Sequence, residues 1–351
     1  WRAPSVKSSD SKEGIVNGKS DTAKKPVLQT LLTYFLRFKA LGVLVILVLL
    51  VVFVGFFSPE NNFVRPQNIT NLLAYGSEFA VIVLGVGMLM IAGEFDLSVG
   101  SVLAFGAFIF SSLFRAGVAP FPAFLVTMVG GAVMGLINGL ITVKGKILSF
   151  VATLGTMMMW RGLTLLFTGG QQRPCDVTEY RAFTWIFTGR IGGFFPMQAV
   201  WFFLFAVILI FLLHKHSFGN WVYGTGDNPL AARAMCINTD IVKIVCFIIV
   251  GLLVAFASIM QIIRVGAFST RVGTGWELKI IAAAVVGGTS LLGGRGTMVG
   301  IFLGALIIMV IENALTVTRL PYEWTFMVYG LVILGSALLD LFIEKQKLKY
   351  V

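Results

Sequence analysis

Long uncharged stretches of apolar residues recur from residue 40 almost to the C-terminus. Most are long enough to cross the apolar core of a bilayer, which takes about 20 helical residues. Strands of a membrane barrel would alternate apolar and polar residues, and these stretches do not. The pattern therefore predicts an all-α, polytopic membrane protein with about ten transmembrane helices, some of them broken or re-entrant. The composition agrees, because 57% of the residues are hydrophobic and only 12% are charged.

Polar segments between the apolar stretches set the expected boundaries. A tail, 1–38, precedes the membrane domain, 39–345, and a basic tail, 346–351, follows it; the first tail is predicted to be disordered. Segments 58–75 and 168–196 are predicted to be loops. The predicted spans are 40–57, 78–93, a third running from the polar break at 93–100 to residue 114, 124–143, 147–167, 197–213, 241–263, 280–292, 297–311 and 324–341.

The 27 lysines and arginines are distributed unevenly between the two sides of this domain. Roughly two thirds lie on the side that holds both termini and the polar segment 214–243, and such an excess marks the cytosolic side. The sequence therefore places both termini and this segment in the cytosol. Retention of loops by basic residues also accounts for the net charge of +11 without a nucleic-acid partner.

Segment 214–243 contains a short helix with a clear start signal. Asn228 is a good N-cap, Pro229 suits the first helical position because it lacks an N–H, and the alanines that follow favour helix. A helix of about two or three turns is marginal in water, so we expect a surface to dock against it. That surface is either lipid headgroups or a cytosolic partner protein. The residues assigned to this docking helix are Asp227, Asn228, Pro229, Leu230, Ala231, Ala232, Arg233 and Ala234.

The second predicted span stops at a polar break that contains Glu94, Asp96 and Ser98. A charged group within a membrane span costs roughly 2.5–3.5 kcal/mol, so it requires a compensating role. A discontinuous helix could line a cavity here, as broken helices do in transporters. Alternatively, the break is a solvated turn at the membrane edge. Arg161 and Glu312 are further charged residues within or at the end of apolar stretches.

One face of the predicted span 147–167 is polar, because its hydroxyl and indole side chains recur at steps of three or four residues. Hydroxyl groups beside an indole suit a sugar, whose hydroxyls hydrogen-bond and whose C–H face packs against aromatic rings. Alternatively, the hydroxyls bond the preceding turn of their own helix and only assist packing. The members of this polar face are Ser149, Thr153, Thr156, Trp160 and Thr164.

Two glycine repeats predict close helix packing. Gly131, Gly135 and Gly139 follow a four-residue spacing, and Gly300 and Gly304 repeat it. Small residues on one face let helix backbones approach closely within lipid. This pattern indicates packing and implies no function.

Several kinds of chemistry are missing from the sequence. The string nearest to a phosphate-binding P-loop, 288–295, lacks the required lysine and hydroxyl. His214 and His216 have no metal-ligand spacing with other residues, and no Ser–His–Asp grouping suits catalysis in a membrane. We therefore expect no catalytic residue, no metal site and no cofactor in this chain, and a transporter rather than an enzyme.

Four segments lie at the predicted breaks, on the polar face and in the docking helix: 93–100, 152–156 with Arg161 and Gly162, 226–234 and 287–296. Together they resemble the membrane-spanning permease of a bacterial ABC sugar importer, the ribose/xylose/galactose type of the binding-protein-dependent transport family. This sequence departs from that family where Glu94 and Cys236 stand in place of the usual glycine.

The resemblance implies that the chain forms the translocation path for a pentose, hexose or related polyol across the bacterial cytoplasmic (inner) membrane. It implies three protein partners: a cytosolic ABC ATPase that binds the ATP and Mg²⁺, an extracytoplasmic solute-binding protein, and a second permease copy or a paralogue. Helix 229–235 would then be the coupling helix, seated on the ATPase. The residues expected on or beside the path are Glu94, Asp96, Ser98, Ser149, Thr153, Thr156, Trp160 and Glu312.

Two other functions stay open at this level. A secondary carrier or channel without an ATPase would share the broken helices and could use Glu94 and Asp96 for ion coupling. An ABC permease for amino acids or nucleosides would share the whole architecture.

Overall fold

The computed structural model describes residues 39–319 and, beyond them, 321, 323–324, 327–331, 334–335 and 338. Both predicted tails and half of the predicted span 324–341 lie outside these residues. Seven helices of the described part are long and apolar enough to cross a membrane, and α4 is a shorter apolar helix. The elements are α2 (Lys39–Phe57), η1 (Pro59–Val64), α3 (Pro66–Ile91), α4 (Val99–Arg115), α5 (Pro120–Lys144), α6 (Ser149–Thr168), β1 (Arg173–Pro174), α7 (Arg181–Thr188), β2 (Arg190–Ile191), β3 (Phe195–Pro196), α8 (Met197–His214), α9 (Ser217–Asp227), α10 (Pro229–Ala234), α11 (Thr239–Val265), β4 (Ala267–Phe268), α12 (Trp276–Val286) and α13 (Met298–Val317).

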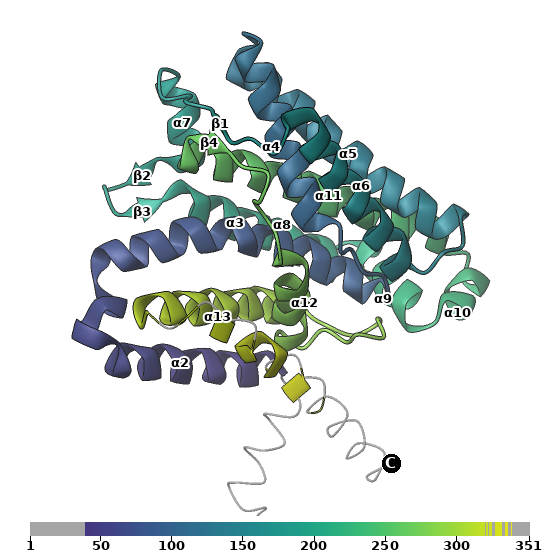
Figure 1. The fold of residues 1–351 in the computed structure, drawn as a ribbon. Coiled ribbons are helices and arrows are strands. Elements are labelled where there is room, and N and C mark those ends of the chain that lie inside the picture. Colours follow the sequence, from purple (N-terminus) through teal and green to yellow (C-terminus); the bar gives the residue numbers. More distant parts are fainter. Residues whose placement is uncertain are drawn as a thin grey trace, which may run out of the picture.

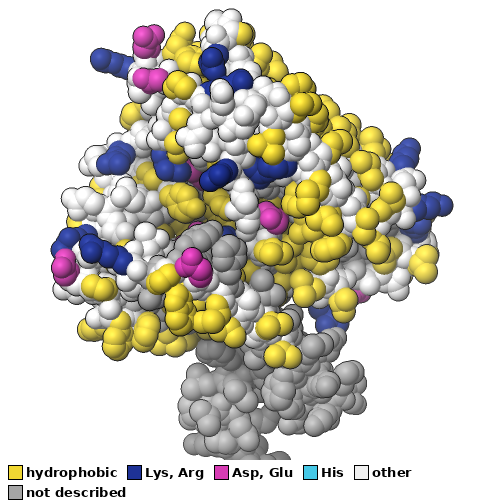
Figure 2. Space-filling view, in the orientation of Figure 1, with side chains coloured by type: hydrophobic (Ala, Val, Ile, Leu, Met, Phe, Trp, Pro, Cys, Tyr) yellow, Lys and Arg dark blue, Asp and Glu magenta, His cyan; other side chains and the backbone are white. Residues whose placement is uncertain are grey.

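Helix α3 forms the centre of the bundle. In its most apolar stretch 78% of the residues are buried, against 11% in α2, which lies at the periphery beside α13 (Figure 1). Helix α11 packs between α3, α4 and α5. The side chains that α2 leaves exposed are apolar, among them Leu49 and Phe53. Figure 2 shows apolar side chains spread over the visible flank of the molecule, as expected for a surface that faces lipid.

The two predicted glycine seams are confirmed. A Cβ on Gly131 would lie 2.4 Å from the carbonyl oxygen of Gly251, and one on Gly135 would lie 2.3 Å from that of Phe247, so these glycines let α5 touch the backbone of α11. On α13, a Cβ on Gly300 would lie 2.1 Å from the carbonyl oxygen of Gly287, at the end of α12. Small residues therefore set the distances between two helix pairs.

Three predicted segments differ from the structure, the first of them the predicted loop 168–196, which contains α7 and three short strands. The predicted loop 58–75 is helical from Pro66 onward, because Pro66 starts α3 and the polar groups of its first turns are bonded within the protein. The predicted span 280–292 ends early, since α12 stops at Val286 and Gly288 takes a φ of +85°. Residues 287–297 form a second break, between α12 and α13.

Segment 214–243 is not a simple loop around one helix. It contains α9, α10 and the first turn of α11. Helix α10 starts as predicted, because the side chain of Asn228 accepts a hydrogen bond from the Ala231 N–H at 3.0 Å and Pro229 takes the first position. It is shorter than predicted, with six residues. Cys236 follows it at a φ of +62°, a left-handed conformation that favours glycine.

The two ends of the bundle differ in their elements. Figure 1 shows α9 and α10 at one end, and α7 with the short strands at the opposite end. There β1 pairs antiparallel with β4, Arg173 opposite Phe268, and β2 pairs with β3, Arg190 opposite Pro196. We refer to these as the α10 end and the strand end.

Candidate functional site

The predicted break between the second and third spans is confirmed. Helix α3 ends at Ile91, Gly93 takes a φ of +85°, and α4 begins at Val99. The segment between them, 92–98, is buried at most positions. A buried break leaves backbone N–H groups without helical partners, and these require other acceptors.

Helix α6 supplies two of those acceptors. The Phe95 N–H donates to Ser149 Oγ at 3.1 Å, and the Leu97 N–H donates to Thr153 Oγ1 at 3.1 Å. Two predicted path residues, Ser149 and Thr153, thus contact the break, which itself contains three others, Glu94, Asp96 and Ser98. Their oxygens hold the broken backbone in place.

Asp96 and Ser98 form a buried polar cluster with Asn138 of α5. Asp96 Oδ1 accepts hydrogen bonds from the Ser98 N–H at 2.8 Å and from Ser98 Oγ at 2.6 Å. Asn138 Nδ2 donates to Asp96 Oδ2 at 3.2 Å and to Ser98 Oγ at 2.8 Å. The Oδ1 atom of Asn138 has no partner among the described residues. The sequence analysis missed Asn138. The only signal for it was an amide side chain within an apolar predicted span.

Three backbone segments meet behind this cluster. The Gly294 N–H donates to the carbonyl oxygen of Ile91 at 2.8 Å. A Cβ on Gly293 would lie 2.7 Å from the Cα of Gly93, and one on Gly226 would lie 1.9 Å from the Ile91 oxygen. The first break, the end of α9 and the second break therefore touch directly, next to the start of α10. The glycines of the predicted motifs allow this contact.

The rest of the polar face of α6 is turned into the protein. Thr156 Oγ1 donates to the carbonyl oxygen of Thr153 at 3.2 Å and Thr164 Oγ1 to that of Trp160 at 2.7 Å, as in the packing alternative. The ring of Trp160 packs on Phe105 with 5.1 Å between centroids. Its Nε1–H has no partner among the described residues. The face therefore combines helix-internal bonds with one unpaired donor.

Arg161 ties α6 to distant backbone. One guanidinium nitrogen, Nη1, donates to the carbonyl oxygens of Thr270 at 2.6 Å and Val272 at 3.1 Å, and Nη2 donates to that of Gly100 at 3.0 Å. These carbonyls belong to the first turn of α4 and to the segment between β4 and α12. Arg161 was noted in the sequence as a charge within a span, but without a partner.

Glu312 is not brought together with the other predicted path residues. Its Oε1 atom lies 2.5 Å from Nζ of Lys279, which comes from α12. Both side chains are largely buried. The pair holds α12 against α13, away from the first break.

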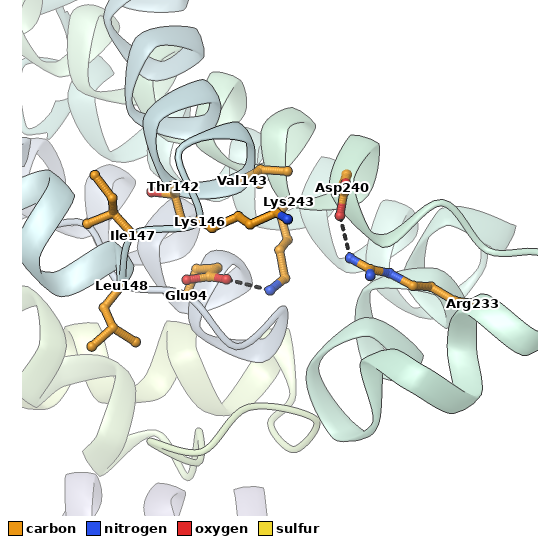
Figure 3. Close-up of a pocket in the computed structure, with 9 residues that line it drawn as sticks. All are labelled: Glu94, Thr142, Val143, Lys146, Ile147, Leu148, Arg233, Asp240 and Lys243. Atoms are coloured by element: carbon orange, nitrogen blue, oxygen red, sulfur yellow. Dashed lines mark hydrogen bonds and ion pairs between the residues drawn. The ribbon is translucent and has the colours of Figure 1, made fainter.

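A pocket of about 200 Å³ opens between the first break and α10 (Figure 3). Glu94 points into it and pairs with Lys243 of α11, with 2.5 Å between Oε1 and Nζ. On its other side, Nη2 of Arg233 lies 2.7 Å from Oδ1 of Asp240. The remaining lining residues are Thr142, Val143, Lys146, Ile147 and Leu148. Among the described residues no group of three or more His, Cys, Asp or Glu side chains could hold a metal ion.

Helix α10 presents an exposed apolar tip. Leu230 and Met235 are 78% and 76% exposed, although both are large hydrophobic residues. Ala231 is exposed, whereas Ala232 is 3% exposed and faces α9. Asp227, the last residue of α9, lies against Gly294 of the second break. The tip thus projects from a base that is joined to both breaks.

Comparison with known proteins places this arrangement in a family. The sequence profile described as "Branched-chain amino acid transport system / permease component" matches residues 68–337. The chain belongs to this permease family. The autoinducer 2 import system permease protein LsrC of Salmonella typhi is 34% identical to it over 293 residues, 82% of each chain. The ribose import permease protein RbsC of Escherichia coli K12 is 33% identical over 283 residues, 80% of this chain and 87% of its own. No solved structure matches the chain.

Membership settles the general role of the chain. It is a permease subunit of an ABC importer, a multi-pass protein of the inner membrane, and a transporter rather than an enzyme. The ATP hydrolysis of such importers is done by a separate ATPase. A secondary carrier that acts alone is therefore disfavoured.

Proposed function

We propose that the chain forms the translocation path for a sugar or a related polyol. Support comes from the two relatives, whose names state import of ribose and of autoinducer 2. The observation on which the proposal rests is the buried first break, whose backbone is bonded to hydroxyl groups of the polar face of α6 and which also touches the second break. In transporters, helix breaks of this kind offer backbone dipoles and polar groups to polar substrates. Glu94, Asp96 and Ser98 lie on this break, Ser149 and Thr153 are bonded to it, and Thr156 and Trp160 follow along the same face of α6.

We further propose that α10 is the coupling helix that seats on a cytosolic ATPase. Its exposed Leu230 and Met235 need a partner, because large apolar side chains at the tip of a soluble helix favour burial. A helix of six residues is too short to be stable alone. This assignment puts the α10 end in the cytosol, in agreement with the excess of basic residues on that side. The strand end would then receive a solute-binding protein, and a second permease copy would complete the path.

A capture experiment tests the coupling assignment. Purified complexes of the wild type and of Ala231→Glu are compared for a bound ATPase and for ATP hydrolysis. Ala231 is exposed, so a glutamate there adds charge to the tip without disturbing the fold, whereas Ala232 is buried and its replacement would disrupt α9 packing. The matched control is Ala182→Glu, at an exposed position of α7 at the strand end. Loss of the ATPase in Ala231→Glu alone supports the assignment. Equal capture in all three proteins contradicts it.

Uptake measurements test the substrate class. Cells that express the complete importer are given labelled D-ribose or labelled L-leucine, since the family description names branched-chain amino acids. Uptake of ribose, reduced by Trp160→Ala and Thr156→Val, supports a sugar path along α6. Uptake of leucine alone would replace the sugar proposal with an amino-acid permease. Unchanged ribose uptake in both variants would limit the polar face of α6 to packing.

A further inference from the structure

Two ion pairs in the pocket of Figure 3 connect α10 to the first break. Arg233 of α10 donates to Thr239 Oγ1 at 2.8 Å and to Asp240 Oδ1 at 2.7 Å, both at the start of α11. Asp240 and Lys243 are three residues apart, so they share one face of that helix. Lys243 in turn donates to Glu94 on the break at 2.5 Å. Two ion pairs, joined to each other by one turn of α11, thus connect α10 with the first break.

The two pairs differ in how far water reaches them. The side chains of Arg233 and Asp240 are 58% and 51% exposed, and an exposed pair of this kind contributes little. Those of Lys243 and Glu94 are only 21% and 11% exposed. Their attraction is less screened, and separating them leaves two charges that water solvates poorly. The inner pair is therefore the stronger of the two connections.

The pocket is small for a substrate site. Its volume of about 200 Å³ falls below the roughly 300–1,000 Å³ of common ligand pockets. Its walls include Ile147 and Leu148, beside the turn between α5 and α6. The charged end of Glu94 is turned to Lys243 rather than to free space (Figure 3). The hollow is thus small and its carboxylate is already paired, features that favour a narrow mouth over a site that holds a sugar.

We propose that the Glu94–Lys243 pair is a latch that closes the path at the α10 end. This inference rests on the proposed function, because it takes the first break as part of the path and α10 as the ATPase contact. In the closed state the pair holds segment 92–98 against α11. Movement of α10 is passed to α11 through Arg233 and Asp240, and separation of the latch frees the break. Glu94 is thus a positioning residue, and it controls opening without touching the substrate. The pair has two arrangements, joined and separated, and the ATPase shifts the population from one to the other.

The first test needs the permease alone. Thr142→Cys places a thiol in the pocket wall, where the wild-type threonine is 5% exposed, in a chain whose exposed Cys236 is replaced by serine. We expect Glu94→Gln or Lys243→Met to raise the labelling rate of this thiol by N-ethylmaleimide about tenfold, the effect of one lost charge-assisted contact. The exchange Glu94→Lys with Lys243→Glu should return the rate to within about threefold of the parent. Arg65→Gln, which removes the exposed 3.7 Å pair with Glu60 near the start of α3, is the control and should change nothing.

The second test uses the complex with its ATPase in liposomes. Each single latch variant should hydrolyse ATP about tenfold faster without binding protein and import less ribose per ATP, and the charge exchange should reverse both. A purely structural pair would lower import and hydrolysis together. Unchanged thiol labelling in the single variants overturns the latch, whatever the ATPase does. If the labelling changes but the permease captures no ATPase, the coupling role of α10 is overturned. The pair would then still close the path, but without control by an ATPase.

Discussion

Arg264 holds Glu78 through two parallel hydrogen bonds, with 2.7 Å between Nε and Oε1 and 2.9 Å between Nη2 and Oε2. The carboxylate is fully buried between α3 and α11, and the guanidinium lies 5.4 Å from the centre of the Tyr75 ring. A bidentate pair of this geometry fixes both helices in register. It joins the central helix of the bundle to its longest neighbour.

Removal of one partner of this pair should be strongly destabilising. Glu78→Gln leaves Arg264 without its counter-charge, and the loss of one member of a buried pair costs about 3–5 kcal/mol. The thermal midpoint of the purified protein in detergent measures the effect. Glu60→Gln, in the exposed pair with Arg65, is the control and should shift the midpoint little. Similar shifts in the two variants would show that the buried pair contributes no more than a surface one.

A methyl group in the α5–α11 seam should separate the helices. In Gly135→Ala the new Cβ would lie 2.3 Å from the carbonyl oxygen of Phe247, which cannot move without α11. We expect a loss of about 1–3 kcal/mol, as for an overpacked core. Gly155→Ala on α6 is the matched control, because nothing lies within 4 Å of its Cβ and alanine favours helix. The thermal midpoints of the two variants check the prediction, because Gly135→Ala should unfold at the lower temperature. A Gly135→Ala variant more stable than Gly155→Ala would refute it.

Loss of a hydroxyl at the first break should cost more than the loss of one within a helix. Thr153→Val removes the acceptor of the Leu97 N–H and leaves a buried donor unpaired, at about 1–3 kcal/mol. Thr164→Val removes only a bond to the preceding turn of its own helix and should cost less. Hydrogen exchange at Leu97 should accelerate in Thr153→Val alone. Equal exchange in both variants would mean that Thr153 does not hold the break.

Thiol labelling should distinguish the three cysteines and report orientation. Cys236 is exposed beside α10, whereas Cys175 and Cys246 are 2% and 0% exposed. Burial also raises the pKa of the Cys175 thiol to about 11, so at pH 8 little of it is thiolate, the reactive form. A membrane-impermeant maleimide should therefore label one cysteine, in inside-out vesicles only. Cys236→Ser should abolish the signal. Labelling of intact cells would reverse the proposed orientation.

Local signals in the sequence predicted those features that local chemistry determines. The start of α10 follows from Asn228 and Pro229, which act within one turn. The first break follows from charged residues flanked by glycine, and the α5 seam from small residues at a four-residue spacing. In each case the cause lies within a few residues of its effect. These parts of the fold could therefore be predicted without a structure.

The features that were missed depend on partners far along the chain. The first turns of α3 were predicted to be part of a loop that contains Pro59 and Pro66. In the structure, Asn68 in these turns exchanges hydrogen bonds with Asn313, 245 residues later. Glu94 was assigned to the path because a charge stood in an apolar region, and only the fold shows Lys243 beside it. Glu312 was assigned to the same group for the same reason, and only the fold shows Lys279, on another helix, beside it. No local pattern identifies such partners.

The three carbonyl bonds of Arg161 have a consequence for the order in which the chain is made. Two of its acceptors, on Thr270 and Val272, follow it by 109 and 111 residues. At roughly 5–20 residues per second, α6 waits on the order of 5–20 s before these acceptors are synthesised. During that time the guanidinium in the membrane has only Gly100 ahead of it in the chain. The first half of the protein is therefore synthesised with a charge that lacks two of its three acceptors until the second half follows.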